Sequence, residues 1–322
     1  DNFDARAEFT EPEIRRTNLA AVILQMKLLG FGAIETFPFL DPPDAKLISD
    51  GYRTLEELAA IDADGGLTPL GRQLARLPVD PRIGRMLLAA ESHHCLRELL
   101  IIASALSVQD PRERPMDKQQ AADEIHASFQ HQDSDFLTLL NLWAFLEQER
   151  KALSRNKFQK QCRQHFLSWN RVQEWRDIHT QLREQMHELG HKESDTEGTF
   201  EEVHRALLTG LLSNIGLKDE QREYLGARGG RFYIHPSSAL FPGRSGAGPK
   251  WIACAERVET TRQYGRIAAK VQPGWIEAAG AHLIKRSYSE PHWQSKSGQV
   301  AGFETVTLYG ITLASRRRVN YG

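Results

Sequence analysis

Apolar residues in the first part of the chain recur at helical spacing. They predict an amphipathic helix over residues 13–29, with apolar positions at Ile14, Leu19, Val22, Ile23, Met26 and Leu29. Further helical patterns at 45–50 and 54–61 precede turn residues at 64–71, where Gly-Gly begins a short hairpin that ends in a strand or a helix cap. Three short helices with a small hairpin are typical of a winged helix. Its second and third helices are not notably basic, which favours a packing role over nucleic-acid contact.

The middle of the chain is helical throughout, from residue 81 to about residue 216. The expected helices cover 83–90, 96–106, 117–130, 135–149, 154–168, 169–189 and 200–212. No self-similar period of 34 or 40 residues is visible, so a solenoid is excluded. The pattern predicts one helical bundle.

After Gly216 the period changes to short runs rich in β-branched and aromatic residues, separated by Gly, Pro and Ser. Strands are expected at 231–235, 251–258, 265–271 and 304–313, with a helix near 275–280. About five strands in so short a segment favour an OB-like β-barrel. The fold class is therefore multidomain α+β: a winged helix at 13–79, an all-helical bundle at 80–217 and a small OB-fold barrel at 218–322.

The charge is distributed unevenly along the chain. From residue 218 onward there are 16 Lys and Arg residues against 8 Asp and Glu, whereas the preceding residues hold 25 against 34. A basic final third in a chain of net charge −1 indicates a surface for a polyanion. The alternative is that this charge serves solubility alone.

Two regions combine basic and aromatic residues, as single-strand binding requires. The first is 150–176, with eight basic residues, one acidic residue and four interleaved aromatic residues; its candidate contacts are Arg155, Lys157, Asn170 and Arg171. The aromatic residues there suit a core stripe equally well. The second region is the expected barrel, with Arg257, Arg262, Tyr264, Arg266, Lys285, Arg286, Tyr288, His292 and Trp293. Some of these rings are needed to fill the barrel.

No catalytic or metal site is expected. The glycine-rich segment 243–250 is not a P-loop, because Pro249 stands where lysine is required. Three distant cysteines without CxxC spacing predict neither a disulfide framework nor a zinc site, and they favour a reduced cytoplasm. There is no nucleophile elbow, signal peptide or membrane span. The missing initiator Met suggests a fragment or a processed form.

Three blocks in this order resemble the accessory region of DEAH-box RNA helicases. They are TEPEIRRTNL with LLGF and FPFLDPP (10–19, 28–31, 37–43), LTPLG with LPVDP and SDFLTLLN (67–71, 77–81, 134–141), and FYIHPSSAL with Trp251 and TTRQY (232–240, 260–264). The resemblance covers nearly the whole chain. Three further segments are most similar to bacterial HrpA-type members: the sequence at 20–27, the long helices at 158–189 and the final residues RVNYG.

The resemblance implies specific roles. Residues 1–12 would be the tail of a missing second RecA-like domain, followed by a winged helix, a ratchet and an OB-fold. The last two would form part of the RNA channel of a 3′-to-5′ helicase that uses ATP and Mg²⁺. Asn170 and Arg171 fall where the family's ratchet approaches RNA, although the surrounding run is altered. This segment lacks the ATPase motifs, so we expect it to bind no cofactor and to hydrolyse no ATP alone.

The expected partners are RNA, or single-stranded DNA, and the RecA-like domains of the same protein. We expect a cytoplasmic monomer without membrane contact. The competing hypothesis is a protein-interaction module that docks on the RecA core or on a regulator, with incidental basic charge.

Overall fold

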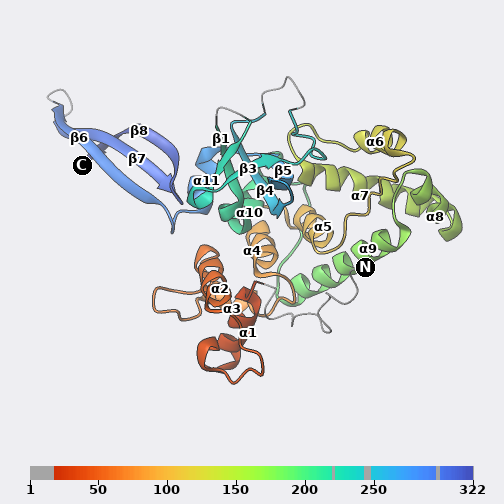
Figure 1. Cartoon of the computed structure of the whole chain (residues 1–322), viewed down its shortest axis with the longest axis horizontal. Helices are drawn as coiled ribbons and strands as arrows, with labels where there is room; N and C mark the ends of the chain where they lie inside the picture. Colours follow the sequence, from red (N-terminus) through yellow and green to blue (C-terminus); the bar gives the residue numbers. More distant parts are fainter. Residues whose placement is uncertain (1–17, 220–221, 243–247, 295–297, 322) are drawn as a thin grey trace, which may run out of the picture. The chain divides into compact units, whose positions relative to one another are not determined.

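The computed structural model describes residues 18–219, 222–242, 248–294 and 298–321 (Figure 1). The chain divides into two compact units, Asp1–Arg85 and Met86–Gly322. The expected tail at 1–12, the start of the helix expected from residue 13 and most of the glycine-rich loop at 243–250 lie outside the described residues.

The first unit is helical. It contains α1 (Ala20–Leu29), the 3₁₀ turn η2 (Ile34–Thr36), α2 (Ala45–Glu57), α3 (Pro69–Leu74) and the start of α4 (Pro81–Ala90). The separate helices expected at 45–50 and 54–61 are one helix, α2. Gly51 does not interrupt it; a Cβ there would lie 2.7 Å from Cδ1 of Ile23, so the glycine allows α1 to pack closely.

After the turn at 64–66 the structure has the expected helix cap, Thr68, which precedes α3. Ile61 and Leu67 form a single antiparallel bridge, and α3 begins directly afterwards. The Thr68 hydroxyl accepts a hydrogen bond from the Gly71 amide at 2.9 Å, and Pro69 occupies the first turn, where its missing N–H is not needed. These two residues explain why a helix starts there.

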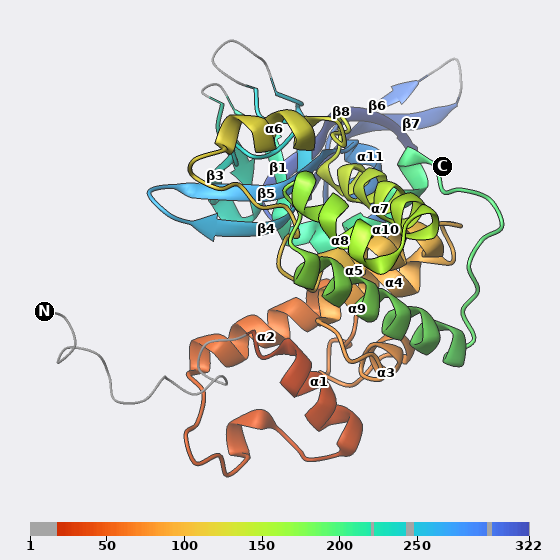
Figure 2. The ribbon, with the colours of Figure 1, turned by 90° about the vertical axis from the view of Figure 1, so that its right-hand side faces the viewer.

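The second unit begins with a helical bundle whose members lie close to the expected positions. They are α5 (Leu96–Leu106), α6 (Gln119–Ala127), α7 (Asp135–Ala152), α8 (Arg155–Gln164), α9 (Trp169–Glu188) and α10 (Phe200–Leu211). Figure 2 looks onto α5, α7, α8 and α9 from the side of α8, and these four helices contribute side chains to one core cluster. Helix α8 is shorter than expected because Phe166 adopts a left-handed conformation, with φ of 51°.

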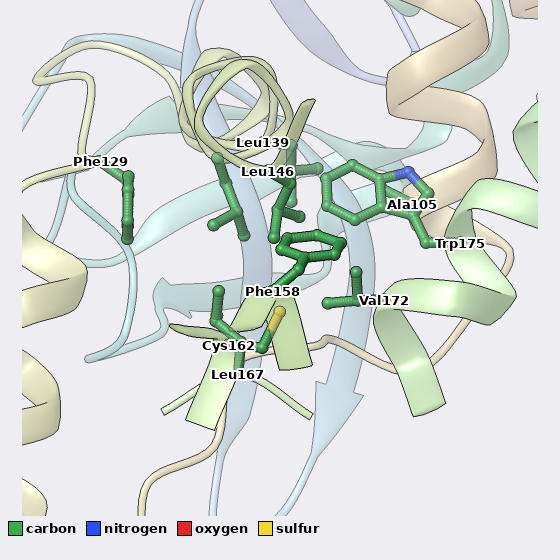
Figure 3. Packing of buried hydrophobic residues seen from close by; sticks show 10 residues of the cluster. Ala105, Phe129, Leu139, Leu146, Phe158, Cys162, Leu167, Val172 and Trp175 are labelled. Atoms are coloured by element: carbon green, nitrogen blue, oxygen red, sulfur yellow. The ribbon is translucent and has the colours of Figure 1, made fainter. Parts of the chain in front are cut away.

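The bundle core gathers side chains from α5, α7, α8 and α9 (Figure 3). Trp175 is completely buried, and its indole Nε1 donates to the Ile101 carbonyl at 3.0 Å and to Oγ of Ser104 at 3.1 Å. Phe158 is 3% exposed and meets Trp169 edge to face, with ring centroids 5.4 Å apart. Phe158, Trp169 and Trp175 therefore contribute to the core, whereas Phe166 is half-buried and lies outside this cluster.

A closed five-stranded barrel follows. Its strands are β1 (Ile215–Lys218), β2 (Tyr224–Gly226), β3 (Arg231–Ile234), β4 (Trp251–Glu259) and β5 (Gln263–Lys270), in the order β1-β2-β3-β5-β4. β3 and β5 run parallel, and the other neighbours are antiparallel. Phe232, Ile234, Ile252 and Cys254 fill the interior. Helix α11 (Pro273–Ala279) comes after the last barrel strand.

The final strands do not belong to this barrel, contrary to the expectation for 218–322. β6 (Lys285–Gln294), β7 (Gln299–Leu308) and β8 (Ile311–Tyr321) form a separate antiparallel sheet in the order β6-β7-β8, labelled in Figure 1. The single strand expected at 304–313 is the β7–β8 hairpin. Tyr309 and Gly310 both have positive φ, 50° and 85°, as a tight two-residue hairpin turn requires.

One carboxylate joins the helical bundle to the barrel. Asp135, the first residue of α7, is 8% exposed. Its Oδ2 accepts from Oγ of Ser238 at 2.5 Å and from the Ala268 amide at 2.8 Å, and its Oδ1 accepts from the Ala239 amide at 2.8 Å. All three donors lie in the barrel or in the loop after β3. Fully bonded in this way, a charged group can be buried at a tolerable desolvation cost.

A buried histidine lies next to this contact. His204 is 1% exposed; its Nδ1 lies 2.6 Å from the Phe200 carbonyl and its Nε2 lies 2.7 Å from Oγ of Ser134. A carbonyl can only accept, so Nδ1 carries the proton and Nε2 accepts from the serine hydroxyl. Burial lowers the pKa of His204 to about 4, although the hydrogen bond to Phe200 opposes the shift.

We expect Asp135→Ala to lower the free energy of unfolding of this chain by about 2–4 kcal/mol, because three barrel donors lose their charged acceptor. Asp133→Ala is the matched control. Its carboxylate is 37% exposed and lies 3.8 Å from Nζ of Lys270, so its loss should cost under about 1 kcal/mol. Urea unfolding followed by far-ultraviolet circular dichroism measures both. Equal shifts for the two variants would show that Asp135 does not anchor the barrel.

His204 should make stability depend on pH between about 6.5 and 4. In that window the unfolded histidine binds a proton and the folded one, with a pKa of about 4, does not. Stability from this group is therefore complete above about pH 6.5 and falls as the pH drops towards 4. In His204→Gln the pH dependence in this window should become weaker but should not vanish, because burial also lowers the pKa of His179 to about 4. The exposed control His187→Gln should keep the full dependence. Thermal unfolding across this pH range tests the difference.

Candidate nucleic-acid interface

The outer face of the β3–β5 strand pair carries a cluster of rings. Phe232 and Ile234 point into the barrel, so the alternating residues Tyr233 and His235 lie on the outside. The parallel register places Tyr233 opposite Tyr264, with ring centroids 6.2 Å apart. His235 meets Tyr264 edge to face at 5.7 Å. This face therefore offers three partly exposed rings side by side.

Basic side chains surround these rings. The Arg262 guanidinium lies over the Tyr233 ring, 5.0 Å from its centroid. Arg266 lies beside the cluster on β5, where it forms an ion pair with Glu256 at 3.3 Å. Burial, followed by the charge of Arg266, lowers the pKa of His235. His235 therefore carries little positive charge near neutral pH.

Two carboxylates, Asp219 and Glu223, lie beside the ring cluster on the Tyr233 side. The Tyr233 hydroxyl donates to the Glu223 carboxylate, and Arg231 forms ion pairs with Asp219 at 2.7 Å and with Glu223 at 3.0 Å. The hydrogen bonds from Tyr233 and Arg231 lower the pKa of Glu223. The same hydrogen bond fixes the Tyr233 ring, which leaves Tyr264 and Arg262 as the less constrained members.

The bundle approaches this face through the loop around Asp110. Arg171, in the first turn of α9, donates to the Asp110 carbonyl at 3.1 Å. The Arg112 guanidinium donates two hydrogen bonds to the Asp110 carboxylate, at 3.0 and 2.7 Å. Burial alone would raise the pKa of Asp110, but the Arg112 hydrogen bonds and charge, with a contribution from Arg266, lower it. The loop thus contacts Arg171 directly, and its Asp110 carboxylate lies within the electrostatic range of Arg266.

The other predicted residues of the bundle lie on its surface. Asn170 is exposed beside Arg171, and Arg155 and Lys157 are exposed on the first turn of α8. Among the described residues, no hydrogen bond or ring contact connects this turn of α8 with the β3–β5 face. Those two cations are therefore a separate charged surface.

Arg257 is placed differently from Arg262 and Arg266. Its guanidinium donates to the Ser213 carbonyl at 3.0 Å and lies over the ring of the interior residue Phe232, at 5.8 Å. It is also close to the backbone at Gly226 and Gly230. These contacts are those of a residue that closes one end of the barrel.

Four predicted contacts belong to the separate sheet instead of the barrel. Lys285, Arg286, Tyr288 and Trp293 all lie on β6. Conversely, Tyr233 and His235 were not among the predicted contacts. Their alternation with Phe232 and Ile234 in the FYIH run was the signal that could have identified them.

A metal site, a reactive thiol and a membrane-spanning helix each have requirements that the described residues do not meet. Among them, no group of three or more His, Cys, Asp or Glu side chains could hold a metal ion. Burial raises the pKa of Cys95 and Cys254 to about 12 and that of Cys162 to about 11, which leaves these thiols unreactive. None of the described helices is long and apolar enough to cross a membrane.

Three family descriptions match consecutive parts of the chain. They are the winged-helix part of the helicase associated domain HA2 at 52–79, its ratchet-like part at 80–139, and an oligonucleotide/oligosaccharide-binding (OB) fold at 203–283. The chain therefore has the winged-helix and ratchet-like parts of the helicase associated domain and an OB-fold, in that order. The expected fold class is confirmed.

The relatives of the chain are ATP-dependent RNA helicases. It is 55% identical to the ATP-dependent RNA helicase HrpA of Escherichia coli and 49% identical to the HrpA homolog of Haemophilus influenzae, in both cases over 100% of this chain and 25% of the relative. It is 31% identical to the splicing helicase prp22 of Schizosaccharomyces pombe over 85% of this chain and 23% of that protein. The chain thus spans about a quarter of the length of these relatives.

The placement of Arg257 and Arg262 predicts effects of different size on the free energy of unfolding when each is replaced by alanine. Arg257→Ala should lower the free energy of unfolding by about 2 kcal/mol, because it removes a hydrogen bond to a carbonyl and a cation–π contact. Arg262→Ala should change it by less than about 0.5 kcal/mol, as expected for an exposed side chain. Chemical denaturation of both variants measures the difference. If Arg257→Ala leaves the free energy of unfolding unchanged, Arg257 does not stabilise the end of the barrel and is a surface cation like Arg262.

Proposed function

We propose that the chain is an accessory module that binds single-stranded RNA and guides it through the nucleic-acid channel of a 3′-to-5′ RNA helicase. The observation that carries the proposal is the pair Tyr233 and Tyr264 on the outer face of the parallel strands β3 and β5, with Arg262 and Arg266 beside it. Rings that stack on bases, next to cations that meet phosphates, are what single-strand binding needs. The OB-fold match and the helicase relatives support it.

The proposal extends to the whole protein. It would use ATP and Mg²⁺ on RecA-like domains, and the present segment would bind neither and would not hydrolyse ATP alone. The partners would be RNA or single-stranded DNA and those RecA-like domains, in a cytoplasmic monomer. The relatives' printed names, which describe ATP-dependent RNA helicases, support the ATP requirement.

The domain boundaries are part of the same proposal. Residues 13–79 would form the winged helix, with 1–12 as the end of a preceding RecA-like domain. The ratchet would begin at residue 80 and would end before β1 starts at Ile215, and not at residue 217. The segment 218–322 would be divided, since the barrel strands end at Lys270 and a separate sheet begins at Lys285.

Protein docking is the second candidate, and one observation favours it. The first unit exposes several large apolar side chains from α1 to residue 40, namely Leu28, Leu29, Phe31, Phe37 and Leu40, the last of them completely exposed. Exposed apolar residues that cluster in one segment mark interaction surfaces. This unit would then dock on the RecA-like domains while the barrel holds RNA, so both functions would operate in one protein.

Fluorescence anisotropy with labelled poly-U RNA and the matching DNA tests the proposal. Affinity should fall with salt, with a slope of log K against log salt near roughly −2 if about three phosphates are contacted, at about −0.7 for each contact. Tyr264→Ala should weaken binding about 5-fold to 100-fold through lost stacking, and Arg262→Glu should weaken it further.

The control is Arg53→Ala, an equally exposed arginine of the first unit, which pairs with Asp50. It should bind like the parent chain. If no RNA binding is detected at low salt, or if Tyr264→Ala and Arg53→Ala behave alike, the β3–β5 face does not hold RNA and protein docking becomes the leading function.

A further inference from the structure

The β6–β8 sheet is an addition to the matched domains. The OB-fold match ends at residue 283, two residues before β6 begins at Lys285. The segment 285–321 contains six basic and two acidic residues. A strongly basic sheet outside the barrel needs a function of its own.

The strand register brings two aromatic side chains to one face of this sheet. Tyr288 pairs with Glu304, and Trp293 pairs with Val300. The two partners on β7 are four residues apart, which puts them on the same face although β6 has a bulge between Ser289 and His292. The rings are thus roughly 13 Å apart along β7, with only Gly302 between their partners on that face.

The inner half of the same face is buried and fixed by charge. Val306, Leu308 and Ile311 are buried. Outward of them, Glu304 forms ion pairs with Arg286 at 2.6 Å and with Arg317 at 3.0 Å, and both arginines also pair with Glu277 of α11, at 2.9 and 2.8 Å.

These ion pairs attach the sheet to α11. Hydrogen bonds from Arg286 lower the pKa of Glu304, and hydrogen bonds from Arg317, with a contribution from Arg286, lower that of Glu277. Both carboxylates therefore stay ionised at neutral pH, and the base of the sheet is held in place.

The outer half of the face is open. Trp293 is 65% exposed and Tyr288 is 54% exposed. The other tryptophans of the chain are buried or partly buried, so Trp293 is unusual. The base of the sheet is firmly held, so a rigid platform presents these rings, which a loop would not provide.

Two cations lie at the edges of this platform. Lys285 is on β6 and Arg318 is on β8, the two edge strands. Both are exposed, and neither forms an ion pair with any residue that the structure describes. In the strand register, however, Lys285 pairs with Thr307 and Arg318 pairs with Phe303, which alternate with the partners of the rings, so both side chains start from the opposite face of the sheet.

We propose that the outer half of the β6–β8 sheet is a second single-stranded nucleic-acid site, in which bases stack on Tyr288 and Trp293. The excess of basic over acidic residues in this segment favours a polyanion over a neutral apolar partner. Because the rings lie well apart, each would take a different base. The inference rests on the proposed function, since it adds a second surface to an RNA-binding chain.

The test uses the intact chain with labelled oligouridine of six and twenty nucleotides. Tyr288→Ala with Trp293→Ala should weaken binding of the twenty-nucleotide RNA at least 5-fold, whereas Trp293→Phe, which keeps a ring, should retain most of it. Binding should also quench tryptophan emission, and Trp293→Phe should remove most of that quenching. The matched control is Phe37→Ala, an exposed aromatic residue of the first unit, which should bind normally.

Comparison with Tyr264→Ala separates the two proposals. If Tyr264→Ala weakens binding but the Tyr288 and Trp293 double variant does not, the barrel binds RNA and the sheet does not; the sheet would then be a protein-docking surface. If the double variant alone weakens binding, the inference stands and the barrel proposal fails. If the parent chain binds neither RNA, both fail.

Discussion

The buried carboxylate of Asp135 is the contact on which the arrangement of the second unit depends. A single residue at the start of α7 accepts hydrogen bonds from β5 and from the loop that follows β3. These are the two parallel strands whose outer face carries Tyr233 and Tyr264. The Asp135 contact therefore fixes the ring cluster relative to the helical bundle, including the Asp110 loop and Arg171. An ionised group in this position tolerates little displacement, because each lost hydrogen bond leaves buried charge unpaired.

The helices were predictable because their residues depend mainly on local spacing. The apolar stripe of α7 and the strongly apolar α5 both lie where the periodicity placed them. Local spacing failed where a distant contact decided the outcome. Gly51 would ordinarily end a short helix, yet its missing side chain is what allows α1 to pack against α2. The hairpin turn at Tyr309 and Gly310 was also missed, because tyrosine is an uncommon residue for a left-handed conformation.

The candidate site was only half predictable, for a physical reason. Composition selected Arg262, Tyr264 and Arg266, at or near the start of β5, but no residue of β3. It could not distinguish Arg257, which lies on the same strand as the buried Trp251 and turns towards Phe232 at the barrel end. Nor could it pair Tyr233 with Tyr264, because parallel neighbours β3 and β5 are separated in sequence by all of β4. Which residues share a face is fixed by barrel closure, and closure is not a local property.

The number of basic residues in the final third of the chain overstates the positive charge that is available to a ligand. Arg231, Arg266, Arg286, Arg316 and Arg317 all form ion pairs with carboxylates of the same segment. These ion pairs neutralise much of the positive charge and stabilise the strands. Few cations are therefore left to displace counterions from a nucleic acid. Binding would then depend on stacking at fixed rings more than on overall electrostatic attraction. Stacking is tolerant of sequence and short in range. A module of this kind would hold a strand that passes through without selecting its sequence, and weak charge neutralisation would let the strand move.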